Sequence, residues 1–215
     1  GRSTKLPHGP KDVTALYSAD LTALFDALSL DGALLVGHAS AGHLALRFSA
    51  LNPERIDKLV SINGSPEFRA GPDWPWGFSE TDMARFETIR REQGIEGLTD
   101  AVLDPGNVFR DLAPKDADRL AAWLRPMSLA AGAETLMGFF DSISLDDDRD
   151  LMSRIAAPTL LISGTIGREV PSEVNLFLRR EIPGAKLVEL PGVDHFSFAT
   201  RPALVNALID DMRRS

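Results

Sequence analysis

A tight turn between a short apolar run and a helix is the part of this sequence best suited to chemistry. His38, Ala39 and Ser40 occupy the turn, directly after Gly37. In α/β folds a sharp turn between strand and helix often carries a nucleophile, because it exposes one side chain at the end of the sheet. Ser40 offers a hydroxyl there, whereas Ala39 offers only a methyl group that cannot attack a substrate.

The flanking residues predict the elements that hold this turn. An apolar run over 34–36 predicts a strand buried on both faces, and apolar residues at helical spacing over 40–51 predict a helix. Asn52 and Pro53 end that helix, and a second apolar run over 59–62 predicts another strand. These segments form one strand, helix, strand unit.

The stretch 33–64 resembles the nucleophile elbow of the α/β-hydrolase family, commonly VGHSxGG followed by a helix ending in NPER or YPER. The matching residues are Val36, Gly37, His38, Gly42, Ala45, Leu46, Arg47, Pro53, Glu54 and Arg55. The resemblance implies an α/β-hydrolase fold, in which a mostly parallel sheet is flanked by helices and covered by a helical cap. In register with the motif, Ala39 occupies the nucleophile position and Ala41 replaces the second glycine.

Three explanations stay open for Ala39. An engineered change from serine would silence an enzyme and leave every supporting residue in place, and a natural pseudo-enzyme is the alternative. A third interpretation makes Ser40 the nucleophile, but it places His38 where the elbow requires a small residue. Otherwise Ser40 is a hydroxyl near a helix N-terminus, and the resemblance implies that its backbone amide helps bind the oxyanion.

The catalytic acid of the family has no carboxylate at the matching position. Residues 158–171 resemble the segment PTLLISGxxDxxVP, whose Asp orients the catalytic histidine, and Gly167 stands where that Asp belongs. Glu169, two residues later, and Glu67, after the preceding strand, are candidate substitutes.

The histidine position is retained. Residues 191–196 resemble the family's PGxxHF loop, so the resemblance makes His195 the general base. An imidazole with a pKa near 6.5 can take a proton from a hydroxyl and return it to a leaving group. Asp194 is not expected to be the acid, because it points away when His195 faces the site.

The middle of the chain, residues 65–155, contains no convincing strand and several helical patterns, and it matches the family's cap in position. The core is therefore expected over 1–64 and 156–215. The cap holds too many large apolar side chains for its helices to cover, so some should face an apolar cavity. The residues expected in the substrate pocket are His38, Trp74, Trp76, Phe139 and Phe140.

Four aspartates over 146–150 form the one acidic cluster. Neighbours in an exposed turn seldom converge on a metal, so no metal site and no cofactor are expected. The cluster is expected instead to favour the N-terminus of a short helix over 151–155.

Composition narrows the function classes. A net charge of -8, a pI near 5.0 and the lack of a basic stripe argue against nucleic acid as a partner. The sequence has no cysteine, so it offers no thiolate chemistry and no disulfides. No apolar run approaches the roughly 18 residues of a spanning helix, so no membrane partner and a cytoplasmic location are expected.

The first residues suggest a missing partner segment. Residues 1–4 resemble the end of the family's GxGxS segment, which normally lies well inside the domain. We therefore expect an N-terminal segment or second chain to supply the first strands, since the strand over 33–37 otherwise becomes an open edge. A homodimer also stays open.

The expected function follows from the resemblance. The parent activity is cleavage of an apolar ester, lactone or related carbonyl substrate by Ser-His-acid catalysis, with little or no turnover while Ala39 stands at the nucleophile position. The alternative is a hydrolase scaffold retained as a small-molecule receptor or binding protein.

Overall fold

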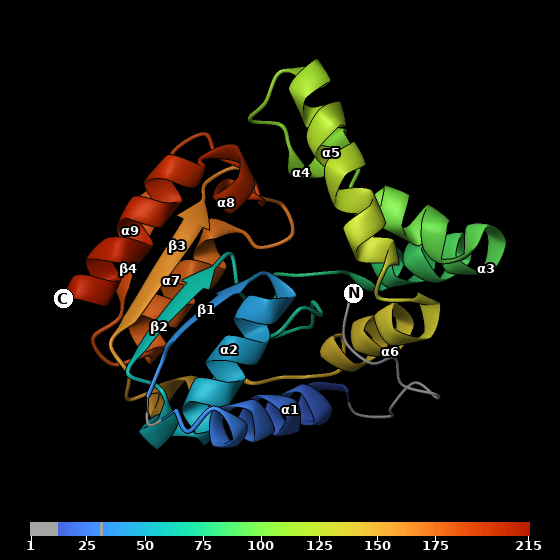
Figure 1. The fold of residues 1–215 in the computed structure, drawn as a ribbon. Coiled ribbons are helices and arrows are strands. Elements are labelled where there is room, and N and C mark those ends of the chain that lie inside the picture. The colour runs from blue at the N-terminus through green and yellow to red at the C-terminus, as the bar shows by residue number, and fades with distance from the viewer. Residues whose placement is uncertain (1–12, 31) are drawn as a thin grey trace.

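The computed structural model describes residues 13–30 and 32–215, which form a layered α/β core and a helical cap (Figure 1). Four parallel strands lie in the order β1-β2-β3-β4. They are β1 (Leu34–His38), β2 (Lys58–Ile62), β3 (Thr159–Gly164) and β4 (Lys186–Leu190). Among the described strands β1 is an outer one, and Val36 is 41% exposed.

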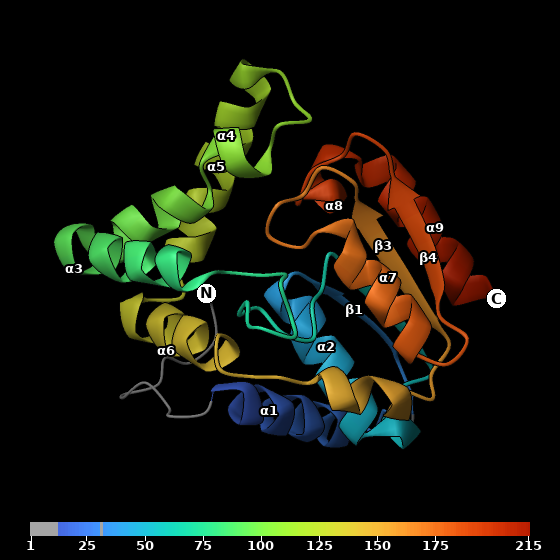
Figure 2. The same cartoon turned by 180° about the vertical axis from the view of Figure 1, so that it is seen from behind.

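Helices cover both faces of the sheet, as the views from the front and from behind show (Figures 1 and 2). One face packs on α1 (Val13–Ala27), α2 (Ser40–Leu51) and α7 (Ser172–Glu181), and the other on α9 (Pro202–Arg214). Neighbouring residues of a strand point to opposite faces, so Leu161 joins the first cluster and Ile162 the second. Three short helices complete the core: η1 (Pro53–Arg55), η2 (Arg149–Arg154) and α8 (Ser197–Thr200).

The cap is built from α3 (Glu80–Val102), α4 (Pro105–Val108), α5 (Pro114–Leu129) and α6 (Ala133–Ile143). Ser79 begins α3 with a capping box, since its side chain accepts from the N–H of Asp82 and its N–H donates to the Asp82 carboxylate. The helix bends at Gly94, where φ is 67°. No helix in the described part of the chain is both long and apolar enough to cross a membrane.

The ends of the expected cap segment pack with the core instead. Phe68 and Trp74 on one side, and Met152 on the other, lie in the same buried cluster as Phe48 of α2. The helical cap therefore occupies the narrower range 80–143, within the expected 65–155.

The acidic cluster lies at the N-terminus of η2, where Asp150 is in the first turn as expected, but Asp148 also has a role in the core. Asp148 is 3% exposed and makes no side-chain cap to η2. Its carboxylate lies 2.5 Å from Nη1 of Arg47 and 3.2 Å from Nε2 of His43, both on α2. The carboxylate of Asp148 is therefore held by side chains of α2, besides its place next to the N-terminus of η2. Among the described residues, no group of histidine and acidic side chains is arranged to hold a metal ion.

Candidate active site

The turn at Ala39 has the strained geometry of a nucleophile elbow. Ala39 adopts φ 51° and ψ -118°, a conformation that costs a residue with a Cβ atom about 1 kcal/mol or more. Its N–H donates to the carbonyl of Ile62 at 2.9 Å, which ties the turn to the end of β2. A Cβ atom on Gly37 would lie 2.3 Å from the carbonyl oxygen of Ala41, so the turn requires glycine there.

The elbow residue is therefore residue 39. The structure does not support Ser40 as the nucleophile. The strained turn is at residue 39, and Ser40 is already the first residue of α2. An N–H group in the first turn of a helix has no acceptor within the helix. The backbone amide of Ser40 is consequently available beside the elbow.

The loop carrying His195 is fixed through its backbone. The carbonyl oxygen of His195 accepts from Nε2 of His38 at 2.9 Å and from Nδ2 of Asn63 at 2.6 Å. Asn63 also accepts from the N–H of Gly164 through Oδ1, so one amide joins the ends of β2 and β3 to the histidine loop. Sequence reasoning missed Asn63; the only signal was its position directly after β2.

Both histidines are held neutral at pH 7. Burial lowers the pKa of His195 well below 6.5, and the neighbouring His38 lowers it further. Burial likewise lowers the pKa of His38 to about 4, partly offset by its hydrogen bond to the His195 carbonyl. A carbonyl only accepts, so Nε2 of His38 carries the proton. His195 is thus available as a base over the whole neutral range.

Glu169 is the carboxylate that the structure brings to His195. Its Oε2 lies 3.9 Å from Nδ1 of His195, and both atoms are buried without a hydrogen-bond partner among the described residues. Burial raises the pKa of Glu169, and the nearby Asp194 raises it further while Arg110 opposes them. A short shift of either side chain would close this pair.

The backbone at residue 167 does not require glycine. A Cβ atom there would lie 3.6 Å from the Val170 carbonyl oxygen and 3.9 Å from the His195 nitrogen, both ordinary contacts. The second substitute, Glu67, is wrong as the acid, because its carboxylate pairs with Arg149 at 3.0 Å and does not line the pocket that holds His195.

Asp194 points away from the imidazole, as expected. It is fully buried, and its carboxylate accepts from Nε and Nη2 of Arg110 at 2.9 and 3.0 Å and from the N–H of His195 at 2.9 Å. Arg110 follows α4 in the cap and also donates to the carbonyl of Ile166. This ion pair, which the sequence did not reveal, joins the cap to the histidine loop.

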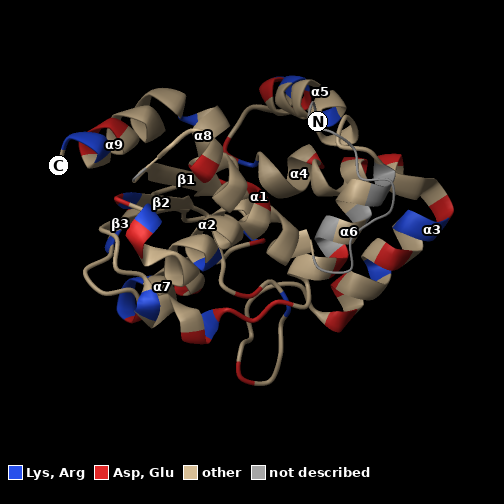
Figure 3. Ribbon diagram, turned by 60° about the horizontal axis from the view of Figure 1, so that its bottom comes forward, with Lys and Arg blue, Asp and Glu red and all other residues tan. Residues whose placement is uncertain are grey.

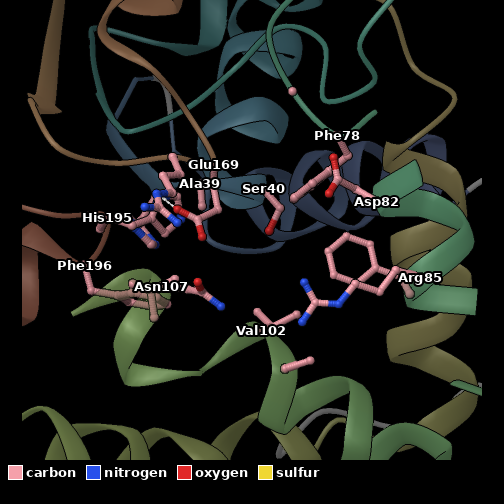
Figure 4. Close-up of a pocket in the computed structure, with 16 residues that line it drawn as sticks. Ala39, Ser40, Phe78, Asp82, Arg85, Val102, Asn107, Glu169, His195 and Phe196 are labelled. Carbon is pink, nitrogen blue, oxygen red and sulfur yellow. Dashed lines mark hydrogen bonds and ion pairs between the residues drawn. The ribbon is translucent and has the colours of Figure 1, made fainter. Parts of the chain in front are cut away.

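One pocket of about 460 Å³ contains both Ala39 and His195, with cap residues on its other side (Figure 4). Ala39 of the elbow and His195 therefore line the same cavity, together with residues from the middle third of the chain. Ser40, Glu169 and His38 also line it.

The aromatic lining differs from the expectation. Trp74 is 1% exposed in the core and donates through Nε1 to the carbonyl of Glu67, and Trp76 packs edge-on against it. Neither tryptophan lines this pocket. The side chains of Phe139 and Phe140 lie outside what the structure describes. The aromatic residues that do line the pocket are Phe78, Phe86 and Phe196.

The parallel sheet flanked by helices, with a strained turn after β1, is the fold of an α/β-hydrolase. The family described as "alpha/beta hydrolase fold" matches residues 1–202, and the chain belongs to this family.

Individual proteins similar to this chain include hydrolases and a receptor. A pimeloyl-[acyl-carrier protein] methyl ester esterase from Nitrosomonas europaea is 28% identical over 202 residues, which cover 91% of this chain and 77% of the relative. Karrikin insensitive 2 receptor IA from Petunia hybrida is 23% identical over 81% of this chain and 61% of its own length. Among solved structures, a hydrolase from Pseudomonas aeruginosa PA01 superposes with a TM-score of 0.81 at 26% identity, covering 100% of this chain and 76% of that one.

Proposed function

We propose that this pocket binds an ester, lactone or related carbonyl compound in position for nucleophilic attack, and that Ala39 prevents its hydrolysis. The observation that supports this most is the strained elbow at residue 39, which lines the same pocket as the neutral imidazole of His195. A methyl group at the elbow leaves binding intact and removes the attacking oxygen. The parent activity is that of a serine hydrolase acting on a carboxylic ester.

In that parent, each remaining group has a defined task. A serine hydroxyl at position 39 attacks the carbonyl carbon while His195 takes its proton, and the amide of Ser40 donates to the oxyanion. His195 then protonates the leaving alcohol, and a water molecule releases the acyl group from the serine. Glu169, the carboxylate near Nδ1 of His195, is the positioning residue.

The substitution Ala39→Ser tests this proposal. We expect it to raise hydrolysis of p-nitrophenyl acetate and butyrate by at least about 100-fold, because loss of a catalytic serine costs up to about a million-fold in kcat. The conformation at residue 39 suits serine as well as alanine, so the melting temperature should stay unchanged. The measurement is release of p-nitrophenol at pH 7.

A matched control identifies the source of any gain. Ala39→Ser combined with His195→Asn should return to the rate of the unsubstituted chain, since the hydroxyl then has no base. A folded Ala39→Ser variant without activity on either ester would contradict the proposal.

The second candidate is a small-molecule receptor. It is favoured by two triad positions, Ala39 and Gly167, that both lack a functional group, and a receptor is among the relatives. The retained His195 favours the enzyme, because a receptor has no need of a buried base. Tight binding of an intact ester together with an inactive Ala39→Ser variant would favour the receptor.

A further inference from the structure

An arginine in the cap faces the pocket and forms no ion pair with the residues that the structure describes. Arg85 of α3 lines the same cavity as Ala39 and His195, and Figure 4 shows its guanidinium directed into that cavity from the side opposite His195. In the described part of the chain its charge acts on Asp82, but the two form no ion pair. The Asp82 carboxylate instead accepts from the backbone N–H and hydroxyl of Ser79.

The other arginines of α3 behave differently. Arg90 pairs with Glu87 at 2.5 Å and with Asp141 at 3.5 Å, and Arg91 pairs with Glu92 at 3.5 Å. Arg85 alone among the three lines the described pocket. A chain of net charge -8 repels anions as a whole, so a cation left unpaired in the pocket is a local feature that favours one.

We propose that Arg85 binds a carboxylate at the far end of the substrate from its scissile carbonyl. This inference rests on the proposed function, because Ala39 and His195 place the carbonyl at one wall. A guanidinium presents two parallel N–H groups that match a carboxylate. Asn107 of α4 directs its amide into the space between the two ends (Figure 4). The substrate class is then a half-ester of a dicarboxylic acid, or a lactone carrying a carboxylate.

Two probes of equal length test the proposal. Monomethyl adipate carries one carboxylate, and dimethyl adipate carries none. Because Ala39 prevents turnover, their dissociation constants can be measured by calorimetric titration on the chain as it exists. We expect the half-ester to bind about tenfold more tightly than the diester, and added salt should weaken only the half-ester.

Three variants locate the effect. Arg85→Gln should remove the preference for the half-ester and leave diester binding unchanged, whereas Arg85→Lys should retain part of it. Arg179→Gln is the matched control, since Arg179 is an exposed arginine on α7 outside the pocket. This control should change neither constant.

The outcomes separate this inference from the proposed function. Equal binding of the two probes, no binding of the half-ester, or a preference that survives Arg85→Gln overturns the role of Arg85. None of these results bears on the proposed hydrolase site, because the Ala39→Ser esterase assay tests that site separately.

Discussion

At the scale of single residues, the proposed site combines a strained elbow with a neutral imidazole, while Ala39 and Gly167 carry no functional group. Ala39 holds the left-handed conformation of an elbow, and His195 stays neutral in the same pocket. Gly167 has room for a side chain, and Glu169 lies near the imidazole nitrogen that a catalytic acid would engage. The missing groups can therefore be restored without rebuilding the backbone.

The role of Glu169 can be measured in the Ala39→Ser background. We expect Glu169→Gln to lower kcat by about tenfold with little change in KM, because the amide orients the imidazole less well and cannot stabilise its charged form. Gly167→Asp in the same background should raise kcat, since it supplies a carboxylate beside the His195 loop. Unchanged kcat in Glu169→Gln would exclude Glu169 as the positioning acid.

The lowered pKa of His38 predicts that the protein loses stability in mild acid. Its folded pKa is about 4, whereas an unfolded histidine titrates near 6.5. Below pH 6.5 the unfolded chain therefore binds a proton that the folded chain does not, and stability falls as the pH drops from about 6.5 to about 4. Between about pH 7 and pH 5, His38→Gln should reduce the loss in unfolding free energy by about 2 kcal/mol. Urea unfolding at both values measures it, and an identical loss in the two proteins would contradict the prediction.

At the scale of elements, the cap is attached to the core beside the catalytic loop. Arg110 reaches from the cap to the buried Asp194, whose carboxylate also accepts from the N–H of His195. Cap position and histidine orientation are thus coupled through one carboxylate. A second ion pair, between Asp111 and Arg201 at 3.2 Å, reinforces the contact.

Breaking the Arg110 pair should destabilise the protein. Arg110→Ala leaves Asp194 buried without its cation, and we expect a loss of about 2–4 kcal/mol in unfolding free energy, since one end of the pair is partly exposed. Arg125→Ala is the matched control, because Arg125 forms its ion pair with Asp100 within the cap at the surface. It should leave the unfolding midpoint nearly unchanged. Equal effects of the two substitutions would show that the Arg110 pair does not join cap and core.

At the scale of the whole molecule, the pocket lies between two units that the chain builds in separate stretches. The core supplies the elbow and His195, and the cap supplies Arg85 and Phe86. Acidic and basic residues both occur along α3 and α5 (Figure 3), within a chain of net charge -8. Arg85, which has no ion-pair partner among the described residues, is therefore a feature of one position in the pocket and not of the surface.

The order of elements could be predicted because its signals are local. The apolar runs at 34–36 and 59–62, the Asn52-Pro53 stop and the capping box at Ser79 each act within a few residues, and the structure contains the corresponding strands and helices. The pocket's aromatic lining could not be predicted in this way. Trp74 and Phe78 lie four residues apart, yet one enters the core and the other the cavity.

The sequence by itself determined the fold family, the elbow at Ala39 and the loop that carries His195, because strand, turn and helix patterns need only neighbouring residues. Only the tertiary structure decided that Glu169, and not Glu67, approaches the imidazole, and that Arg110 pairs with Asp194. Those contacts join residues from 26 to 84 positions apart in the sequence. The distances between these side chains depend on the conformations of the loops that join the packed elements. A pattern of neighbouring residues in the sequence does not specify those conformations.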